Sequence, residues 1–475
     1  MLNFDTNVQA LKYKVLKEVA RAHFNGTLLK DYNDIPKIIV PGPKPTMRCC
    51  IYKERAIVLE RMYLAQGGDR NNDNVVQVLN IACDECPLGG YEVTRTCRGC
   101  IAHRCEKACH RNAIVFDEIT HTAKIDKTKC VNCGLCSKAC QYGAILNFKR
   151  PCESACKVKA ISMGEDYAAK IDDSKCIQCG ACVYQCPFGA IMDKSYITDV
   201  IDILKDSDFS KKYHVYAVVA PSISSQFKYA TLGQIVTAIK KLGFHSVVEA
   251  ALGADMVAYD EAKELEEKGM LTSSCCPSFV NFIEKKYPNL TSYISSNLSP
   301  MAAISKYIKS VDPTSKVVFI GPCIAKKKEI QKETVKPYVD KVLTFEELQA
   351  LIDSRDIVAS TLEENKLDNA SYYGRIFARC GGLSDAVKEA LKEQESSFEV
   401  KPLPADGLDN CKIALDKLAS KSEKDFNFIE GMACCNGCIG GPCCLTHEFR
   451  DKSEVDKYGR EAMEKTILDA IKVLK

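Results

Sequence analysis

The stretch Thr272-Ser273-Ser274-Cys275-Cys276-Pro277 opens a series of cysteine motifs that decides how the C-terminal part of this chain folds. Two motifs follow it, Gly321-Pro322-Cys323-Ile324-Ala325-Lys326 and Glu430-Gly431-Met432-Ala433-Cys434, and Cys438 closes the series. The motifs supply the four thiolates that a cubane iron–sulfur cluster requires, from Cys276, Cys323, Cys434 and Cys438. Cys275 adjoins one of them without a ligand role of its own. A free thiol beside a metal centre is a candidate proton carrier, because its pKa can be drawn toward neutrality there.

The composition agrees with a metalloprotein of several domains. The chain has 475 residues, 28 Cys and no Trp, and its length suggests two to four domains. Its N-terminus, Met1-Leu2-Asn3-Phe4-Asp5, has neither the basic start nor the apolar segment of a signal peptide. We therefore expect metal-bound thiolates in a reducing cytoplasm rather than disulfides. No apolar run of about 18 residues predicts a membrane span, and a net charge of +3 gives no reason to expect nucleic-acid binding.

A cysteine repeat occupies the middle of the chain. Cys130-x2-Cys133-x2-Cys136-x3-Cys140 and Cys176-x2-Cys179-x2-Cys182-x3-Cys186 have the bacterial ferredoxin spacing. In that arrangement three close cysteines hold one 4Fe–4S cluster and the fourth serves the neighbouring cluster. Two variant copies accompany them, Cys97-x2-Cys100-x4-Cys105-x3-Cys109 and Cys152-x3-Cys156. Zinc knuckles are the alternative, but zinc sites seldom carry the fourfold run with a trailing Ala-Ile.

Exchange of the fourth ligand between neighbouring motifs predicts how the cysteines group. The first set is Cys97, Cys100, Cys105 and Cys140; the second is Cys109, Cys130, Cys133 and Cys136; the third is Cys156, Cys176, Cys179 and Cys182. Cys152 and Cys186 remain, and Cys83-x2-Cys86 upstream would complete a fourth set with them. The alternative is three clusters, with Cys83 and Cys86 binding zinc or no metal.

The pattern of apolar residues indicates three parts. Residues 1–80 form an N-terminal helical region, with an amphipathic helix within 1–30 and a second helix around 53–64. Residues 81–200 form the ferredoxin-like cluster region, and residues 205–475 form the catalytic domain. The sharp change in composition near Thr198 predicts that the catalytic domain folds without the residues before it.

The catalytic part shows an alternation of strands and helices. Buried strands are expected at 214–220, 246–251 and 316–320, with a helix at 232–241 between the first two. This order predicts an α/β fold with a parallel sheet. A single closing helix is expected over 453–474.

The three terminal motifs, in spacing and order, closely resemble the signature segments of the iron-only (FeFe) hydrogenases over roughly residues 210–475. The resemblance implies an α/β catalytic domain with two lobes around its active-site cluster, preceded by α+β ferredoxin-like domains. It implies an H-cluster, in which Cys438 bridges the cubane to a two-iron subsite carrying CO, cyanide and a dithiolate. It also implies reversible oxidation of H2 to protons, a ferredoxin or flavodoxin as electron carrier, and dedicated maturation proteins.

The resemblance assigns roles to further residues. Cys275 matches the thiol that exchanges protons with the dithiolate amine, and Glu261, Glu264 and Ser295 match the rest of that relay. On its own, a glutamate pair three residues apart is usually a solvated helix surface. Lys326 matches the lysine that donates to a cyanide ligand, with Glu329 as its partner. Met432 matches a methionine packed on the two-iron site, and Ser222 lies in a loop that matches the dithiolate lining.

Three departures from the best-known pattern point to a less common, monomeric branch, often called group B. Gly321 stands where a methionine that shields the bridging CO is usual, Phe279 replaces a tryptophan, and Cys435 replaces histidine or glycine. A non-catalytic iron–sulfur assembly scaffold and an H2 sensor share the fold and remain alternatives. A plain polyferredoxin would leave the terminal motifs unexplained.

Overall fold

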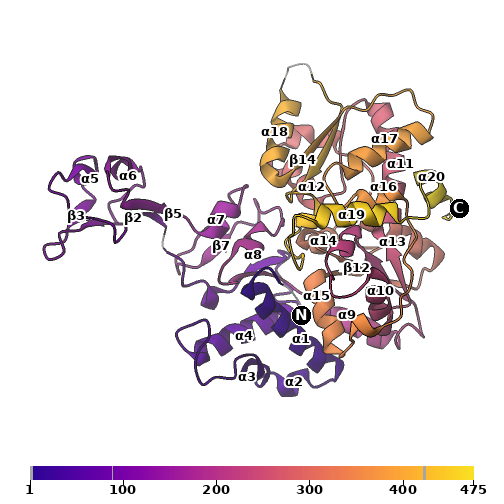
Figure 1. The fold of residues 1–475 in the computed structure, drawn as a ribbon, viewed down its shortest axis with the longest axis horizontal. Helices are drawn as coiled ribbons and strands as arrows, with labels where there is room; N and C mark the ends of the chain where they lie inside the picture. The colour runs from indigo at the N-terminus through magenta and orange to yellow at the C-terminus, as the bar shows by residue number, and fades with distance from the viewer. Residues whose placement is uncertain (1–3, 88, 421–423, 475) are drawn as a thin grey trace.

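The computed structural model describes residues 4–87, 89–420 and 424–474 (Figure 1). A four-stranded parallel sheet with the order β10–β9–β12–β13 forms the centre of one lobe. Its strands are β9 (Val215–Val219), β10 (Ser246–Glu249), β12 (Lys316–Gly321) and β13 (Lys341–Thr344). The central strands β9 and β12 are almost continuous apolar runs, as expected for parallel strands covered on both faces. The predicted parallel sheet is confirmed.

Helices follow these strands where the sequence provides start signals. A capping box between Thr231 and Gln234 starts α10 (Leu232–Lys241), whose bounds match the prediction. Strand β10 ends at Glu249, because Ala250 and Ala251 already belong to the long helix α11 (Ala250–Lys268). The predicted strand 246–251 was therefore two residues too long. The lobe is completed by α13 (Pro300–Val311) and α15 (Phe345–Ser354).

A second parallel sheet, with the order β11–β15–β14, forms the centre of the other lobe. Its strands are β11 (Leu271–Thr272), β15 (Phe428–Met432) and β14 (Pro402–Asp406). Helices α12 (Pro277–Lys286), α17 (Gly382–Glu393) and α18 (Gly407–Ala419) accompany it. Each of the three cysteine motifs lies directly after the carboxyl end of a strand, which is β11, β12 or β15. Such strand ends are where α/β proteins build their sites.

The C-terminal segment differs from the prediction. It forms two helices, α19 (Asp451–Arg460) and α20 (Ile467–Lys472), instead of one closing helix. The break lies just before Thr466, whose hydroxyl accepts a hydrogen bond from the backbone N–H of Asp469 and so starts a new helix.

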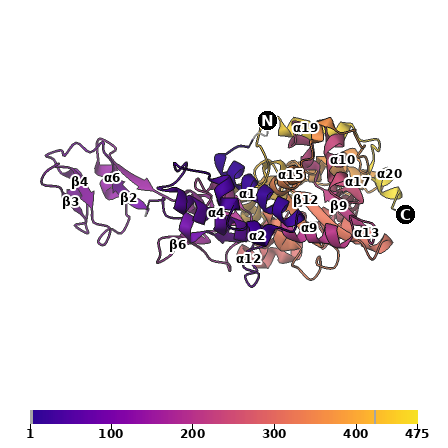
Figure 2. The same ribbon diagram turned by 90° about the horizontal axis from the view of Figure 1, so that it is seen from below.

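The N-terminal region contains α1 (Asn7–Phe24), α2 (Leu28–Asp31), α3 (Ile35–Ile39) and α4 (Ile51–Ala65), which include both predicted helices. Helix α1 packs against α15, and Figures 1 and 2 show the two side by side. Val15 and Val19 share one apolar core with Val218 of the central sheet. Helix α9 (Ile197–Asp206), at the change in composition, buries Val200 in the same core. The change in composition near Thr198 is therefore not a boundary in the packing.

The cluster region has two halves. Nearest the catalytic lobes, β1 (Val76–Val78) pairs with β8 (Ile191–Asp193) and β6 (Ile161–Met163) pairs with β7 (Ala169–Ile171). Helices α7 (Pro151–Ala155) and α8 (Ala181–Gln185) lie beside them. The other half forms an arm, residues 90–148, that extends away from the rest (Figures 1 and 2). Its strands pair as β2 (Gly90–Val93) with β5 (Ile145–Phe148) and β3 (Ile114–Phe116) with β4 (Ala123–Ile125).

Within the described ranges, no helix combines the length and apolar character needed to cross a bilayer.

Candidate active site and cluster sites

An apolar cavity of about 90 Å³ lies between the two lobes. Five thiols from the three motifs line it, those of Cys275, Cys276, Cys323, Cys434 and Cys438. Lys326 and Met432 line it as well. The structure therefore brings the four predicted cubane ligands and the surplus thiol together around one space, although they lie far apart in the sequence.

Local structure explains how the thiols reach the cavity. Cys276 and Cys323 are the N-cap residues of α12 and α14 (Ile324–Glu329), where the positive end of the helix dipole favours a thiolate. Gly437 turns the chain into Cys438 with φ of 86°. A Cβ at Gly437 would lie 2.8 Å from the sulfur of Met432, so only glycine fits this turn without movement.

The thiols fit a metal cluster by their chemistry. Burial and the neighbouring thiols Cys276 and Cys438 raise the pKa of Cys323 to about 12. The pKa of Cys434 is also raised well above its usual value, first by burial. Bound metal is what keeps buried thiols deprotonated. Four converging thiols in an apolar cavity are suited to an iron–sulfur cubane.

The predicted relay residues Glu264, Ser295 and Glu261 lie near one another, and one oxygen of Glu261 has no hydrogen-bond partner among the described residues. The Ser295 hydroxyl donates a hydrogen bond of 2.9 Å to Glu264, and Lys268 lies 2.6 Å from the other oxygen of that carboxylate. Glu261 is fully buried and accepts a long hydrogen bond of 3.4 Å from the Ser274 N–H. Burial raises the pKa of Glu261 to about 7, which is suited to proton exchange near neutral pH.

Cys275 is the next residue of the predicted relay. Its pKa is raised well above the usual value by burial and then by the charge of Glu261. The thiol is therefore protonated, and Cys275 both lines the cavity and lies within electrostatic range of Glu261.

Lys326 is held in the cavity wall. Its Nζ lies 2.6 Å from a Glu329 oxygen and donates to the Cys275 carbonyl at 3.3 Å. Burial lowers the pKa of Lys326, but Glu329 outweighs this effect and the net pKa is above its usual value. The ammonium is therefore charged and points its remaining donor capacity toward the cavity. This is the arrangement expected of a group that binds an anionic ligand.

The other two predicted residues lie differently. Met432 ends β15, is 3 % exposed and lines the cavity. Ala220 and Pro221 also line it, whereas Ser222 is not among the described lining residues. The Ser222 hydroxyl is buried and has no hydrogen-bond partner in the described parts of the chain. Its role therefore stays a prediction.

The arm brings together two of the predicted cysteine sets. A cavity of about 160 Å³ is lined by all four members of the second set, Cys109, Cys130, Cys133 and Cys136. In the first set, Cys105 lies close enough to Cys100 and Cys140 for their charges to raise its pKa, after the larger effect of burial.

The sets nearer the catalytic lobes follow the same pattern. In the third set, Cys176 and Cys156 act electrostatically on Cys179, whose pKa burial raises to about 12. Cys83 and Cys186 act in the same way on Cys86 and on Cys152, so the four cysteines that the sequence left unpaired are neighbours. Cys179 also lies close enough to Cys276 and Cys434 to influence them, which places the third set beside the main cavity.

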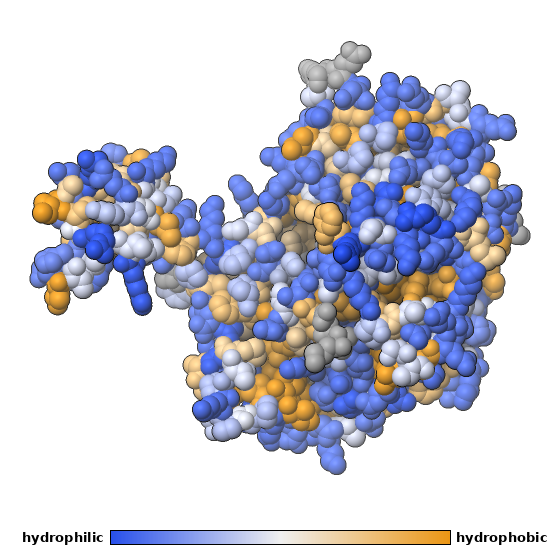
Figure 3. All heavy atoms as spheres, viewed as in Figure 1, coloured by the Kyte–Doolittle hydropathy of each residue, from blue (hydrophilic) through white to orange (hydrophobic). Residues whose placement is uncertain are grey.

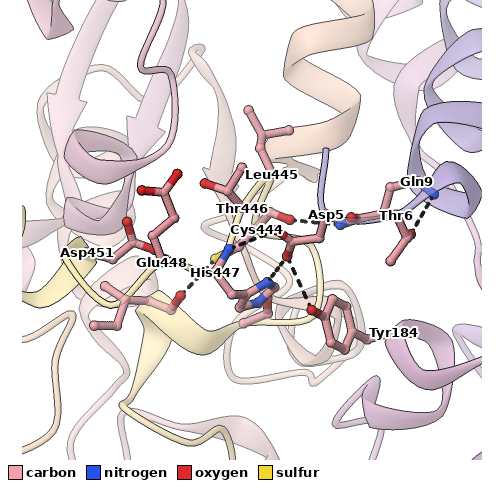
Figure 4. Close-up of polar contacts among 12 residues, drawn as sticks. Asp5, Thr6, Gln9, Tyr184, Cys444, Leu445, Thr446, His447, Glu448 and Asp451 are labelled. Atoms are coloured by element: carbon pink, nitrogen blue, oxygen red, sulfur yellow. Dashed lines mark hydrogen bonds and ion pairs between the residues drawn. The ribbon is translucent and has the colours of Figure 1, made fainter. Parts of the chain in front are cut away.

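A polar contact fixes the loop that follows Cys438. The ring nitrogens of His447 contact the Asp5 carboxylate and, at 2.9 Å, the carbonyl oxygen of Gly441 (Figure 4). Tyr184 of α8 donates to the same carboxylate at 3.2 Å. The N-terminus, the third cysteine set and the cavity loop are thus joined. Sequence motifs gave no indication of this contact, because its members come from three distant segments.

Sequence analysis also missed three residues of the site. Phe319 and Phe377 line the cavity. Glu430 is buried behind it and accepts hydrogen bonds from the backbone of Gly381 and from Ser384. Phe319 and Glu430 each lie four residues before a motif cysteine, Cys323 and Cys434, and the spacing along a strand could have indicated which face they occupy.

Comparison with known proteins agrees with this geometry. Residues 213–442 match the family model "Iron only hydrogenase large subunit, C-terminal domain". Residues 96–144 match a 4Fe-4S dicluster domain, and residues 169–192 match a 4Fe-4S binding domain.

Two named hydrogenases align with about two thirds of this chain. Iron hydrogenase 1 of Clostridium pasteurianum is 29% identical over 381 residues, which are 68% of this chain and 65% of that protein, a little under two thirds of its length. The periplasmic Fe hydrogenase large subunit of Nitratidesulfovibrio vulgaris is 30% identical over 382 residues, 68% of this chain and 86% of that protein. A cytosolic Fe-S cluster assembly factor, NAR1 of Kluyveromyces lactis, is 35% identical but over only 92 residues, 19% of this chain and 20% of that protein. By these matches the chain belongs to the iron-only (FeFe) hydrogenase large-subunit family, with 4Fe-4S ferredoxin domains before its catalytic domain.

Proposed function

We propose that this protein is an active hydrogenase that catalyses reversible H2 oxidation and proton reduction at an H-cluster. One observation carries the proposal: the four predicted ligands, the surplus thiol Cys275 and the charged Lys326 meet around one apolar cavity. When bound, the cluster supplies redox-active iron that exchanges two electrons with the substrate. Cys276, Cys323, Cys434 and Cys438 would hold it, and Lys326 would donate to its anionic ligands.

The protein's own contribution to the reaction is the movement of protons. Cys275 keeps a proton at the cavity wall, and Glu261 can take it, because its pKa near 7 allows both protonation states at neutral pH. The Ser295 hydroxyl donates to Glu264 and acts on the pKa of Glu261, and because a hydroxyl can both accept and donate it would pass protons between the two carboxyl groups. Glu264 pairs with the half-exposed Lys268 at the protein surface, where protons exchange with water.

Electrons would enter through the cluster region. We propose four accessory 4Fe–4S clusters, because the fourth cysteine set assembles in the same way as the other three. The third set, beside the main cavity, would pass electrons to the cubane. The carrier would be a ferredoxin or flavodoxin that docks on the arm.

Further properties follow from the residues that depart from the usual pattern. We propose from Gly321 and Cys435 that the protein resembles the group B branch of monomeric hydrogenases. It would be a cytoplasmic enzyme of anaerobic metabolism whose two-iron subsite is inserted by maturation proteins.

Infrared spectroscopy of anaerobically matured protein tests the proposal. Bands from metal-bound CO and cyanide are expected, together with H2 evolution from a chemical electron donor. Fully loaded protein without these bands and without H2 chemistry would favour the assembly scaffold that NAR1-like relatives represent.

Cys275→Ser separates the proton role from metal binding. The variant should keep its iron content and its infrared bands, because no ligand is lost. Its turnover should fall steeply, since a hydroxyl has a far higher pKa than a thiol. Cys276→Ser is the matched control, and it should lose the cubane. Loss of the cluster in Cys275→Ser, or wild-type turnover, would contradict the relay.

A further inference from the structure

Glycine at position 321 creates a space that another side chain fills. Gly321 and Phe319 are two residues apart on β12, so both face the same side of the sheet. A Cβ at Gly321 would lie 2.7 Å and 2.9 Å from two atoms of the Phe319 ring, and 3.1 Å from the Cβ of Ala220. The two distances to the ring are shorter than carbon–carbon contacts allow, and the distance to Ala220 is tight. The Phe319 ring therefore covers Gly321.

The ring lies in the wall of the active-site cavity. Phe319 is 4 % exposed and lines the cavity together with Ala220 and Cys323, which follows Gly321 by two residues. An aromatic ring is rigid and offers few alternative rotamers in a packed interior. It forms a harder wall than a flexible methionine side chain would.

We propose that Phe319 and Gly321 act as a size-matched pair that sets the width of the cavity beside Cys323 and thereby restricts the access of CO and O2 to the two-iron site. H2 is smaller than either molecule, so a narrow aromatic wall discriminates against both. Where position 321 is a methionine, its side chain shields the site; here the Phe319 ring, packed over Gly321, shields it instead. This inference rests on the proposed function for the gas-access step, but the packing of the pair does not.

The packing step is tested on protein that carries only cubane clusters. Gly321→Met should lower the thermal midpoint, because the new side chain overlaps the ring. Phe319→Ala should lower it by leaving a void. The double variant Phe319→Ala/Gly321→Met should recover at least half of the larger single loss, since the methionine fills the vacated space. Additive losses would overturn the pairing, and Phe319→Leu provides a milder variant if Phe319→Ala does not fold.

The access step is tested on matured protein with added CO. Phe319→Ala should be inhibited by CO at least about threefold faster than the wild type at the same CO concentration, because the barrier to entry is lower. Ile320→Ala is the matched control, because Ile320 is fully buried on the same strand and faces the other side. It should lose stability without a change in the rate of CO inhibition. Equal rates of CO inhibition in Phe319→Ala and the wild type would refute the access role. A total absence of CO and cyanide bands in the wild type would refute the proposed function instead, and would leave the packing result standing.

Discussion

Lys327 offers the sharpest test of how the parts of this molecule hold together. Its Nζ lies 2.7 Å from Asp193 and 2.7 Å from Glu347, and it donates to the Lys194 carbonyl at 2.8 Å. All three side chains, of Lys327, Asp193 and Glu347, are fully buried. Lys12 of α1 lies 2.6 Å from the second oxygen of Asp193 and 2.6 Å from Glu346. This network joins α1, β8, α14 and α15.

Lys327→Met removes one cation and leaves two carboxylates without it. Breaking a buried ion pair on one side costs about 3–5 kcal/mol, because a charge stays buried without compensation. In a chain of 475 residues each kcal/mol shifts the thermal midpoint by about 1 °C, so the midpoint should fall by roughly 3–5 °C. The measurement is made anaerobically at one scan rate, because unfolding that destroys clusters is irreversible.

Two further variants test whether the loss of stability comes from the buried network and not from the removal of any lysine charge. Lys336→Met removes an exposed cation that lies 3.4 Å from Glu333, and it should change stability by less than about 1 kcal/mol. Lys327→Met/Glu347→Met removes one of the stranded carboxylates and should recover part of the loss, because Lys12 still compensates Asp193. If Lys327→Met is as stable as Lys336→Met, the network does not hold these elements together.

Three further predictions concern the relay, the N-terminal region and the arm. Glu261→Gln should become more stable relative to the wild type as pH rises from 5 to 8, by up to about 3 kcal/mol. The reason is that burial raises the pKa of Glu261 to about 7. The folded wild type therefore loses stability as pH rises from the unfolded pKa through 7. A difference in free energy of unfolding between variant and wild type that does not change with pH would contradict this. Deletion of residues 1–65 should give insoluble protein, because α1 covers the apolar core that includes Val218; a folded, soluble product would show that the catalytic lobes suffice. Neutralising Arg98, Arg104 and Lys107 should raise KM for an acidic ferredoxin and leave activity with a small chemical donor unchanged. Equal KM values in the variant and the wild type would show that the carrier docks elsewhere.

The last of these predictions depends on the surface of the arm. Five exposed cations lie within residues 95–111 of the arm, and in the described residues none of them forms an ion pair with a carboxylate: Arg95, Arg98, Arg104, Lys107 and Arg111. Ile101 is 99 % exposed and Ile119 is 89 % exposed, and hydrophobic side chains are visible at the far end of the arm in Figure 3. Unpaired charge around exposed apolar side chains is suited to an acidic partner, with steering that salt weakens.

Much of the catalytic fold could be predicted from local signals. The helix at 232–241 was predicted with the correct bounds because its capping box and its apolar spacing agree. Motif spacing alone predicted the sets of accessory cysteines, and the four members of the second set line one cavity. The break before Thr466 was missed, since the threonine that starts α20 lies inside a segment with continuous helical periodicity.

Contacts between distant segments could not be predicted in this way. Lys326-Lys327-Lys328 resembles an exposed charged stretch, yet Lys327 is fully buried. Its partners come from β8 and α15, and nothing near it in the sequence indicates them. The same holds for Phe319, because its contact with the cavity depends on the absence of a side chain at Gly321.

Helix α14 carries both a residue whose role local sequence motifs predict and a residue whose contacts with distant segments they do not predict. It has six residues and begins at Cys323, and successive residues of a helix point in different directions. Lys326 therefore faces the cavity, while Lys327 binds Asp193, the last residue of β8, which follows Cys186 of the cluster region. One short helix thus fixes a predicted cubane ligand relative to the strand that follows Cys186, a member of the fourth predicted cysteine set. The rate of electron transfer falls steeply as the distance between clusters grows. Lys327→Met should therefore slow the reaction with the protein carrier. The reaction with a small donor that reaches the catalytic lobe directly should be slowed less.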